Sequence, residues 1–251
     1  MTAAGKWALV TGAASGIGAE FCRQLEERGF GVLKVDCRPA PGEYSLLLDL
    51  TDQDAAARVM AWLGEIGIVP DLLINNAGIF DFMAVADMDP RRLDLYVDLH
   101  VRAVTQLCRA MVPAMAARGG GMILNMSSMS CWMPMPGIAM YSATKAYIRA
   151  FSRALRLETR DCGVSVTVAC PGGIATDLFG LSPKLQRLGV RVGALYTPRR
   201  FVHGALKAVM GRRKQYINGP VNRLAIVAVG ILPDWVRIWV KYLLLDKLSK
   251  K

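Results

Sequence analysis

Apolar residues recur along this chain with two different spacings, which predicts strands that alternate with helices. Six short runs are rich in Val, Ile and Leu and are apolar almost without interruption. Such runs are typical of strands that a parallel sheet buries on both faces. We expect these strands at residues 7–10, 31–35, 44–48, 72–74, 122–126 and 164–169.

Longer segments between these runs carry apolar residues every three or four positions, the spacing of helices that bury one face. We expect helices from a glycine-rich turn to Arg28, from a cap at Thr51 to about Leu63, at 91–117 with a break near Val97, and at 141–160. Only eight residues, 38–45, follow the second strand, so we expect a turn there and no crossover helix. The alternation predicts a single α/β domain, a doubly wound parallel sheet with helices on both faces.

Composition fits one large domain, and charge sets its last segment apart. The 251 residues are 53% hydrophobic, which is enough for a sizeable core. Residues 1–198 contain 19 Lys and Arg against 18 Asp and Glu, whereas residues 199–251 contain 12 against 2. The net charge of +11 therefore lies almost entirely in the last fifth of the chain.

The cysteine spacing indicates whether the chain has a metal site, and the N-terminal residues indicate its cellular location. Six cysteines show neither C-x-x-C pairing nor metal-ligand spacing, so we expect reduced thiols and no metal site. The chain enters its first strand without an apolar signal segment, and no apolar run reaches the ~20 residues that span a bilayer. We therefore expect a cytoplasmic protein whose basic end could reach a membrane surface.

A glycine-rich turn, TGAASGIG at residues 11–18, joins the first strand to the first helix. Glycines at 12, 16 and 18 would let the backbone approach a pyrophosphate at the helix N-terminus. Any tight strand-to-helix turn favours glycine, however, so this pattern alone is weak. Asp36 ends the second strand, where its carboxylate could bind a ribose diol and repel a 2′-phosphate. Arg38 is the nearby cation that could reverse that preference.

Tyr141 and Lys145 are four residues apart on a predicted helix and so share one face. An ammonium beside a phenol favours phenolate, and we expect it to lower the tyrosine pKa toward neutrality, as a general acid/base requires. Ser128, thirteen residues before the tyrosine, could hydrogen-bond the same reacting oxygen. Taken singly, such a Tyr-Lys pair is more often surface decoration.

Five motifs in order point to one family: TGAASGIG, NNAG, a strand-end serine, YSATK and PGGIAT. With them, residues 5–217 resemble the short-chain dehydrogenase/reductase family. The resemblance implies a single-domain Rossmann-type fold and an NAD(P)-dependent oxidoreductase that moves hydride between a nicotinamide and an alcohol or ketone carbon. The alternative is a nucleotide-binding regulatory or scaffold protein that retains the fold. The helix at 141–160 has an apolar stripe wide enough for a second subunit, so we expect a homo-oligomer.

The resemblance also assigns roles to residues. Ser128, Tyr141 and Lys145 are the expected catalytic residues, joined by His100, which stands where the family usually has a water-holding asparagine. A histidine there could itself titrate, or it could be a half-buried residue outside any proton relay. NAD is the expected cofactor, with NADP less suited. The expected cofactor-binding residues are Gly12, Ser15, Gly16, Ile17, Gly18, Asp36, Asp49, Leu50, Asn76, Ala77, Gly78, Tyr141, Lys145, Pro171, Gly172, Ile174 and Thr176.

Two apolar segments near the predicted site favour a steroid, lipid or aromatic carbonyl substrate over a sugar. Some of these side chains could instead belong to the core. They are Met129, Trp132, Met133, Met135 and Met140 before the tyrosine, and Leu178, Phe179 and Leu181 after PGGIAT.

Residues 221–251 form an expected basic, amphipathic helical extension of a dehydrogenase domain at 1–220. Trp235, Ile238, Trp239, Tyr242 and Leu243 recur there at helical spacing among basic residues. The extension could contact a membrane surface, cover the site or a second subunit, or be a plain domain edge. We expect no nucleic-acid partner, because the aromatic residues lie among aliphatic ones.

Overall fold

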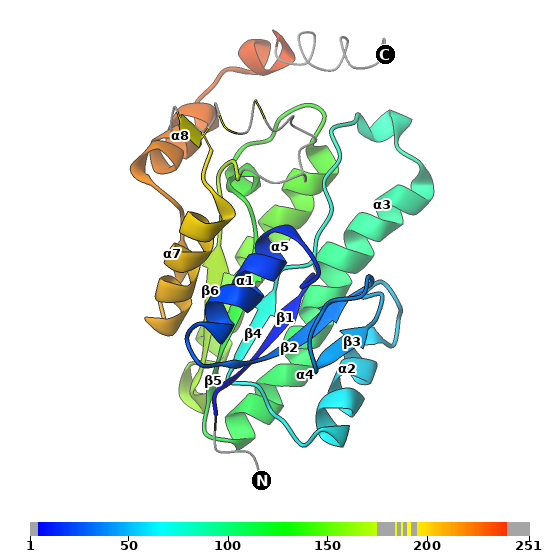
Figure 1. Ribbon diagram of the computed structural model, residues 1–251. Coiled ribbons are helices and arrows are strands. Elements are labelled where there is room, and N and C mark those ends of the chain that lie inside the picture. The colour runs from blue at the N-terminus through cyan, green and yellow to red at the C-terminus, as the bar shows by residue number, and fades with distance from the viewer. Residues whose placement is uncertain (1–4, 175–183, 185–186, 188–189, 192–194, 240–251) are drawn as a thin grey trace.

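The computed structural model describes residues 5–174, 184, 187, 190–191 and 195–239 (Figure 1). Its centre is a seven-stranded sheet with the strand order β3-β2-β1-β4-β5-β6-β7, in which every neighbouring pair is parallel. The doubly wound sheet expected from the sequence is therefore confirmed. The strands are β1 (Trp7–Thr11), β2 (Gly31–Asp36), β3 (Ser45–Leu47), β4 (Leu72–Asn75), β5 (Gly121–Met126), β6 (Val164–Ala169) and β7 (Gln215–Tyr216).

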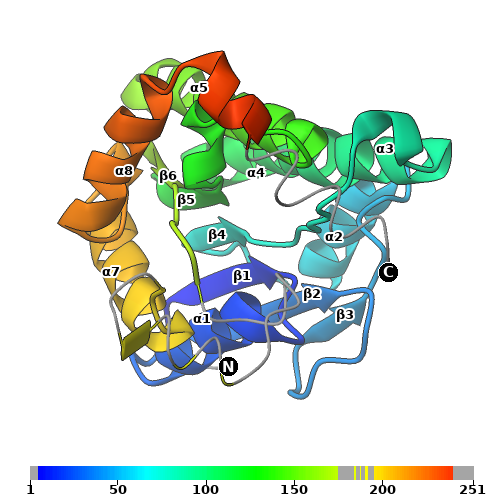
Figure 2. The same cartoon turned by 90° about the horizontal axis from the view of Figure 1, so that it is seen from above.

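Helices cover both faces of the sheet, as the view from above shows (Figure 2). On one face, α1 (Gly16–Glu26) and α7 (Pro198–Met210) bury Phe21, Leu25, Phe201 and Leu206 against the strands. The other face is covered by α2 (Ala55–Glu65), α4 (Val104–Ala117) and α5 (Ala139–Glu158). Burial on both faces explains why the central strands carry few polar residues.

The crossover between β2 and β3 contains no helix, as its length predicted. The cap expected at Thr51 is wrong, because α2 begins at Ala55 and Asp54 takes the N-cap position. The backbone N–H and the hydroxyl of Thr51 both donate to Asp49 Oδ1, at 2.9 and 2.8 Å. This local turn competes with helix formation and delays the helix by one turn.

The break expected near Val97 is present. α3 (Pro90–Val97) passes into a π-helical segment, η2 (Asp98–Ala103), which continues as α4. π-Helical turns are rare and often mark functional sites. The segment holds His100 fully buried.

Three short helices complete the connections around the sheet. They are the 3₁₀ helices η1 (Val85–Asp87), η3 (Met129–Trp132) and η4 (Arg160–Cys162). After β7 the chain enters α8 (Pro220–Gly230), and residues 234–239 are again helical. Parallel strands end at one edge of a sheet, so the glycine turn, NNAG, Ser128 and Pro171 meet at the upper end in Figure 1.

Candidate active site

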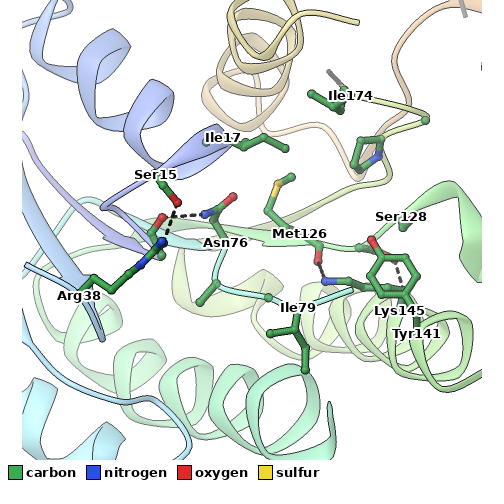
Figure 3. A pocket seen from close by; sticks show the side chains of 17 residues that line it. Ser15, Ile17, Arg38, Asn76, Ile79, Met126, Ser128, Tyr141, Lys145 and Ile174 are labelled. Atoms are coloured by element: carbon green, nitrogen blue, oxygen red, sulfur yellow. Dashed lines mark hydrogen bonds between the residues drawn. The ribbon is translucent and has the colours of Figure 1, made fainter. Parts of the chain in front are cut away.

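A cavity of about 330 Å³ opens where the strands end (Figure 3). Its wall brings together thirteen of the residues expected from the sequence. They are Gly12, Ser15, Gly16, Ile17, Asn76, Ala77, Gly78, Ser128, Tyr141, Lys145, Pro171, Gly172 and Ile174. Four further residues complete the lining, namely Arg38, Ile79, Met126 and Ser127. The sequence indicates Arg38 as a cation that could reverse the cofactor preference set by Asp36. It does not predict the other three residues.

The glycine turn is shaped for close backbone approach. Gly12 has a φ of +66°, which favours glycine, and a Cβ there would lie 2.9 Å from Ala77 Cα. A Cβ on Gly18 would lie 1.8 Å from the Gly12 carbonyl oxygen, so glycine lets α1 start directly beneath the turn. The result is a helix N-terminus behind a turn whose glycines leave the backbone open to close approach, a cradle that fits a pyrophosphate.

Thr11 joins this turn to the NNAG segment. Its hydroxyl accepts hydrogen bonds from the N–H groups of Asn76 and Ala77, at 3.0 and 3.1 Å. Asn76 Nδ2 in turn donates to the Thr11 carbonyl oxygen at 3.0 Å. The ends of β1 and β4 are therefore fixed to each other. No sequence pattern predicts this role for Thr11, because the bonds join residues 65 and 66 positions apart.

Asp36 and Arg38 occupy the adenosine end in a way that the sequence did not show. Asp36 is 5% exposed and does not line the cavity within the described structure. Its Oδ2 accepts the Ala14 N–H and its Oδ1 accepts the Arg38 N–H, both at 2.9 Å. The Arg38 guanidinium lies 3.5 Å from the carboxylate and donates to Ser15 Oγ at 2.7 Å. The charge facing the cavity is thus that of Arg38, and Asp36 is already paired.

Three other expected cofactor residues lie away from the cavity in the described structure. Gly18 is beneath the turn, Asp49 is exposed and holds Thr51, and Leu50 is buried in the core. Thr176, Leu178, Phe179 and Leu181 lie outside the described residues. The nicotinamide end is therefore described through Pro171, Gly172 and Ile174.

Ser128, Tyr141 and Lys145 converge at one end of the cavity (Figure 3). The Ser128 hydroxyl lies beside the Tyr141 phenol in Figure 3 and acts to lower the pKa of that phenol. Lys145 is 4% exposed, donates from Nζ to the Met126 carbonyl oxygen at 3.1 Å, and lies 5.5 Å from the centre of the Tyr141 ring. A reacting oxygen could therefore meet serine and tyrosine together, with the ammonium behind the ring.

The expectation that Lys145 lowers the pKa of Tyr141 is wrong for this structure. Burial raises the pKa of Tyr141 to about 12, and the Ser128 hydroxyl offsets only part of that rise. Burial also lowers the pKa of Lys145 to about 8. The ammonium donates to a backbone carbonyl, so its attraction for a phenolate does not overcome desolvation. The phenol is consequently a neutral proton donor at neutral pH.

His100 lies behind the site and not in its wall. Its Nε2 accepts the Ile79 N–H at 3.0 Å, so the ring proton resides on Nδ1, which donates to Thr144 Oγ1 at 2.9 Å. Burial, then the charge of Lys145, lowers the pKa of His100 well below its usual value. Of the two alternatives left open by the sequence, the structure favours a histidine outside the proton relay, because both ring nitrogens bind protein groups. The geometry gives His100 a positioning role and leaves no free nitrogen for a relay water.

The methionine- and tryptophan-rich segment is mostly structural. Trp132 packs against the buried core, and its ring carries the Arg149 guanidinium at 4.4 Å. Met140 packs with the cluster that contains Tyr141. None of the five side chains expected from this segment lines the described part of the cavity. Across the described residues, no group of three or more His, Cys, Asp or Glu side chains could hold a metal ion.

Comparison with known proteins settles the family. A sequence profile described as short chain dehydrogenase matches residues 6–185, which is most of the chain. The chain belongs to the short-chain dehydrogenase family. As a member of it, this chain is an oxidoreductase of the NAD(P)-dependent kind.

This short-chain dehydrogenase is similar to curated proteins of two kinds. It is 28% identical over 251 residues to the very-long-chain 3-oxoacyl-CoA reductase of Bos taurus, covering 92% of this chain and 77% of the relative. It is 31% identical to the very-long-chain 3-oxoacyl-CoA reductase-A of Danio rerio, covering 82% and 67%. It is also 26% identical to the inactive hydroxysteroid dehydrogenase-like protein 1 of Homo sapiens, covering 98% and 78%. The relatives thus include both reductases and one protein named as inactive.

Solved structures agree with the fold of this short-chain dehydrogenase. A short-chain dehydrogenase from Streptomyces avermitilis superposes with a TM-score of 0.76 and 27% identity, covering 100% of this chain and 99% of that one. A 3-ketoacyl-(acyl-carrier-protein) reductase from Brucella melitensis, complexed with NADH, superposes with a TM-score of 0.74 and 26% identity, covering 85% of this chain and 97% of that one. A short-chain dehydrogenase from Sphingobium yanoikuyae, in complex with NADPH, superposes with a TM-score of 0.74 and 26% identity, covering 89% of this chain and 92% of that one. Similar structures thus bind either nucleotide.

Proposed function

We propose that this enzyme transfers hydride between a nicotinamide and the alcohol or ketone carbon of an apolar substrate. The observation that carries the proposal is the buried contact of Ser128 with the Tyr141 phenol at the end of a cavity that begins at a phosphate-binding turn. A nucleotide-binding protein without catalysis has no need of that arrangement. Intact Ser128, Tyr141 and Lys145 therefore favour an active enzyme over a regulatory or scaffold protein.

The residues of the site divide the chemistry between them. The nicotinamide, when bound along Pro171, Gly172 and Ile174, supplies or accepts the hydride. Ser128 Oγ holds the substrate oxygen in line, which contributes mainly proximity. In ketone reduction Tyr141 Oη donates the proton to that oxygen, and in alcohol oxidation it accepts one. Lys145 stabilises the phenolate left after donation, through its charge behind the ring.

We propose that both NAD(H) and NADP(H) are accepted. Asp36 favours a ribose diol, but its charge is paired with Arg38 and its oxygens are held by backbone N–H groups. Arg38 and Ser15 together offer a cation and a hydroxyl to a 2′-phosphate, which is the donor set that phosphates favour. The preference for NAD expected from Asp36 alone is consequently small in this proposal.

The substrate that we propose is a bulky apolar carbonyl compound such as a steroid, a fatty-acyl derivative or an aromatic ketone. Ile79, Met126 and Ile174 supply apolar wall near the reacting groups. The names of the curated relatives, 3-oxoacyl-CoA reductases among them, support an acyl or comparably long substrate.

We also propose self-association through the outward face of α5. Tyr147 and Phe151 stack there with ring centres 5.7 Å apart, and Tyr147 remains 37% exposed. Phe151 is half-buried against the core, so the stacked pair presents the exposed Tyr147 ring on a fixed base, which suits a partner surface. Light scattering of the purified chain tests this, and a monomer at micromolar concentration would contradict it.

One experiment tests the enzymatic proposal against its rival. NADH and NADPH oxidation is followed with steroid, fatty and aromatic ketones, alongside nucleotide binding by fluorescence titration. An active enzyme shows turnover that Ser128→Ala lowers by at least about tenfold. A protein that binds nucleotide tightly yet turns over none of these substrates would support the regulatory alternative.

A further inference from the structure

An exposed row of apolar side chains runs along the last described helices. Fourteen large hydrophobic side chains are exposed in the described chain, and half of them lie between residues 221 and 239. Their exposed fractions run from 48% for Ile238 to 78% for Ile231. We call them the apolar row: Val221, Leu224, Val227, Ile231, Trp235, Ile238 and Trp239. A concentration of this kind marks an interaction surface.

Helical spacing groups the members of the row on each of the two helices. Val221, Leu224 and Val227 recur every three residues on α8, and Trp235, Ile238 and Trp239 share a side of the helix at 234–239. On α8, Asn222 is buried, and the half-buried residues on its side are Ala225, Ile226 and Val229. The side of α8 that packs on the domain is therefore already apolar, and the row is a second apolar side left exposed.

The protein holds this surface in place beside the active site. Asn222 Nδ2 donates to the Asn218 carbonyl oxygen at 2.7 Å, and Asn218 Oδ1 accepts the N–H of the cavity residue Gly172 at 2.8 Å. A Cβ on Gly172 would lie 2.4 Å from Asn222 Cγ, so α8 rests directly on the cavity wall. Arg237 Nη2 donates to the carbonyl oxygens of residues 229 and 230, at 3.1 and 3.2 Å, and joins the second helix to the end of the first.

Charge shows which partner fits the row. The segment that carries the row, residues 220–251, contains six Lys and Arg against two acids, and one of these acids, Asp234, is paired with Arg237. Arg223 stands exposed on α8 next to the row. A second copy of the chain would bring the same positive segment against itself, and like charges across an interface are unfavourable. An anionic lipid surface is attracted by these cations and accepts Trp side chains at its headgroup boundary.

We propose that the apolar row docks on an anionic membrane surface. Within the described residues no helix is long and apolar enough to cross a bilayer, so the contact is peripheral. The two helices that carry the row lie at the upper end of the molecule in Figure 1, the end at which the strands finish and where the residues that line the cavity gather. Docking therefore brings the cavity close to the lipid surface, where an apolar substrate partitions. The docking itself does not depend on the proposed reaction.

Sedimentation of the full-length chain with vesicles tests the proposal. The vesicles are phosphatidylcholine alone or an equal mixture of phosphatidylcholine and phosphatidylserine. We expect binding to the mixture at low salt and its loss near 1 M salt, where the Debye length falls from about 10 Å to about 3 Å. Replacing Leu224, Ile231 and Trp235 by Ser should lower the partition coefficient at least about tenfold, because apolar burial supplies the binding.

Leu157→Ser is the matched control, since Leu157 is 74% exposed on α5 while Leu224 is 71% exposed in the row. Point variants are preferred to truncation after Gly219, which would remove Asn222 from its contact with the cavity residue Gly172. A wild-type chain that stays in the supernatant at low salt would overturn the proposal. So would a triple variant that binds as well as the control. If the triple variant instead converted a dimer to a monomer, or altered KM without lipid dependence, the row would be a subunit contact or a lid.

Discussion

His100 and Thr144, 44 residues apart in sequence, share a buried hydrogen bond of 2.9 Å between Nδ1 and Oγ1. The threonine hydroxyl is itself within 3.0 and 3.1 Å of the carbonyl oxygens of Met140 and Tyr141. On its other side the ring accepts the Ile79 N–H. A neutral imidazole thus connects the segment after NNAG to the helix that carries the catalytic tyrosine.

Replacing His100 should disturb position and stability without changing the pH dependence of the rate. His100→Ala leaves the Ile79 N–H unsatisfied and opens a cavity, so we expect the free energy of unfolding in urea to fall by about 2–4 kcal/mol. His100→Asn should retain more of that stability and lower kcat/KM by about tenfold. Because the ring stays neutral, the pH–rate profile should keep its shape. If the pH–rate profile of the wild type showed a titration near pH 6–7 that was absent from His100→Asn, the positioning role of His100 would be contradicted.

Tyr141→Phe should abolish turnover while nucleotide binding survives. The phenol oxygen handles the proton, and the ring that packs the site remains in the variant. We expect kcat to fall at least a thousandfold, on the order of the usual loss of general acid catalysis. Tyr147→Phe on the same helix is the control, because Tyr147 contacts Thr105 away from the cavity. A Tyr141→Phe enzyme that kept several per cent of the wild-type kcat would refute the assignment.

The buried ammonium of Lys145 should make stability depend on pH in a defined window. Below about pH 8 the lysine is protonated in both the folded and the unfolded chain. Between pH 8 and its unfolded pKa of about 10.4 the folded chain releases the proton first. The unfolded chain then binds more protons, so the contribution of Lys145 to the free energy of unfolding rises with pH.

The measurement compares urea unfolding of the wild type and Lys145→Met from pH 7 to 10. The free energy of unfolding of the wild type minus that of the variant should rise by about 3 kcal/mol between pH 7 and pH 10. Buried groups with a raised pKa, such as Cys22, Cys108 and Tyr141, act in the opposite direction. They are present in both proteins and cancel in the difference. A difference that stays constant with pH would show that the ammonium is not desolvated.

Arg38 should decide how well NADP(H) is used. Arg38→Ala removes the cation that faces the cavity and leaves Asp36 unpaired, so kcat/KM with NADPH should fall by about tenfold or more. The value with NADH should change little. Arg91→Ala is the matched control, because its side chain is 91% exposed on α3 and does not line the cavity. Equal losses with both nucleotides would show that Arg38 does not contact the 2′-position.

The sequence by itself determined the fold class and six of the seven strands, with β7 not foreseen, and it supplied the reacting groups that the proposed function uses. Apolar runs fixed the central strands, because strands buried on both faces tolerate few polar residues. The eight residues after β2 are too few for a crossover helix, and none forms there. The helix break expected near Val97 is also observed, between α3 and α4. Local spacing also placed Tyr141 and Lys145 on one helix face and set glycines where the backbone had no room for side chains.

Only the tertiary structure decided how those groups behave. The pKa of Tyr141 depends on how deeply neighbouring elements bury it, and the sequence shows a nearby ammonium but not its carbonyl partner on Met126. The bond of Arg38 to Ser15, the bond of His100 to Thr144 and the outward side of α8 likewise arise between distant segments or from the choice of which face is buried. Hydrogen bonding and desolvation act through space, so a linear pattern determines which residues are available, and the folded contacts determine their charge state and exposure.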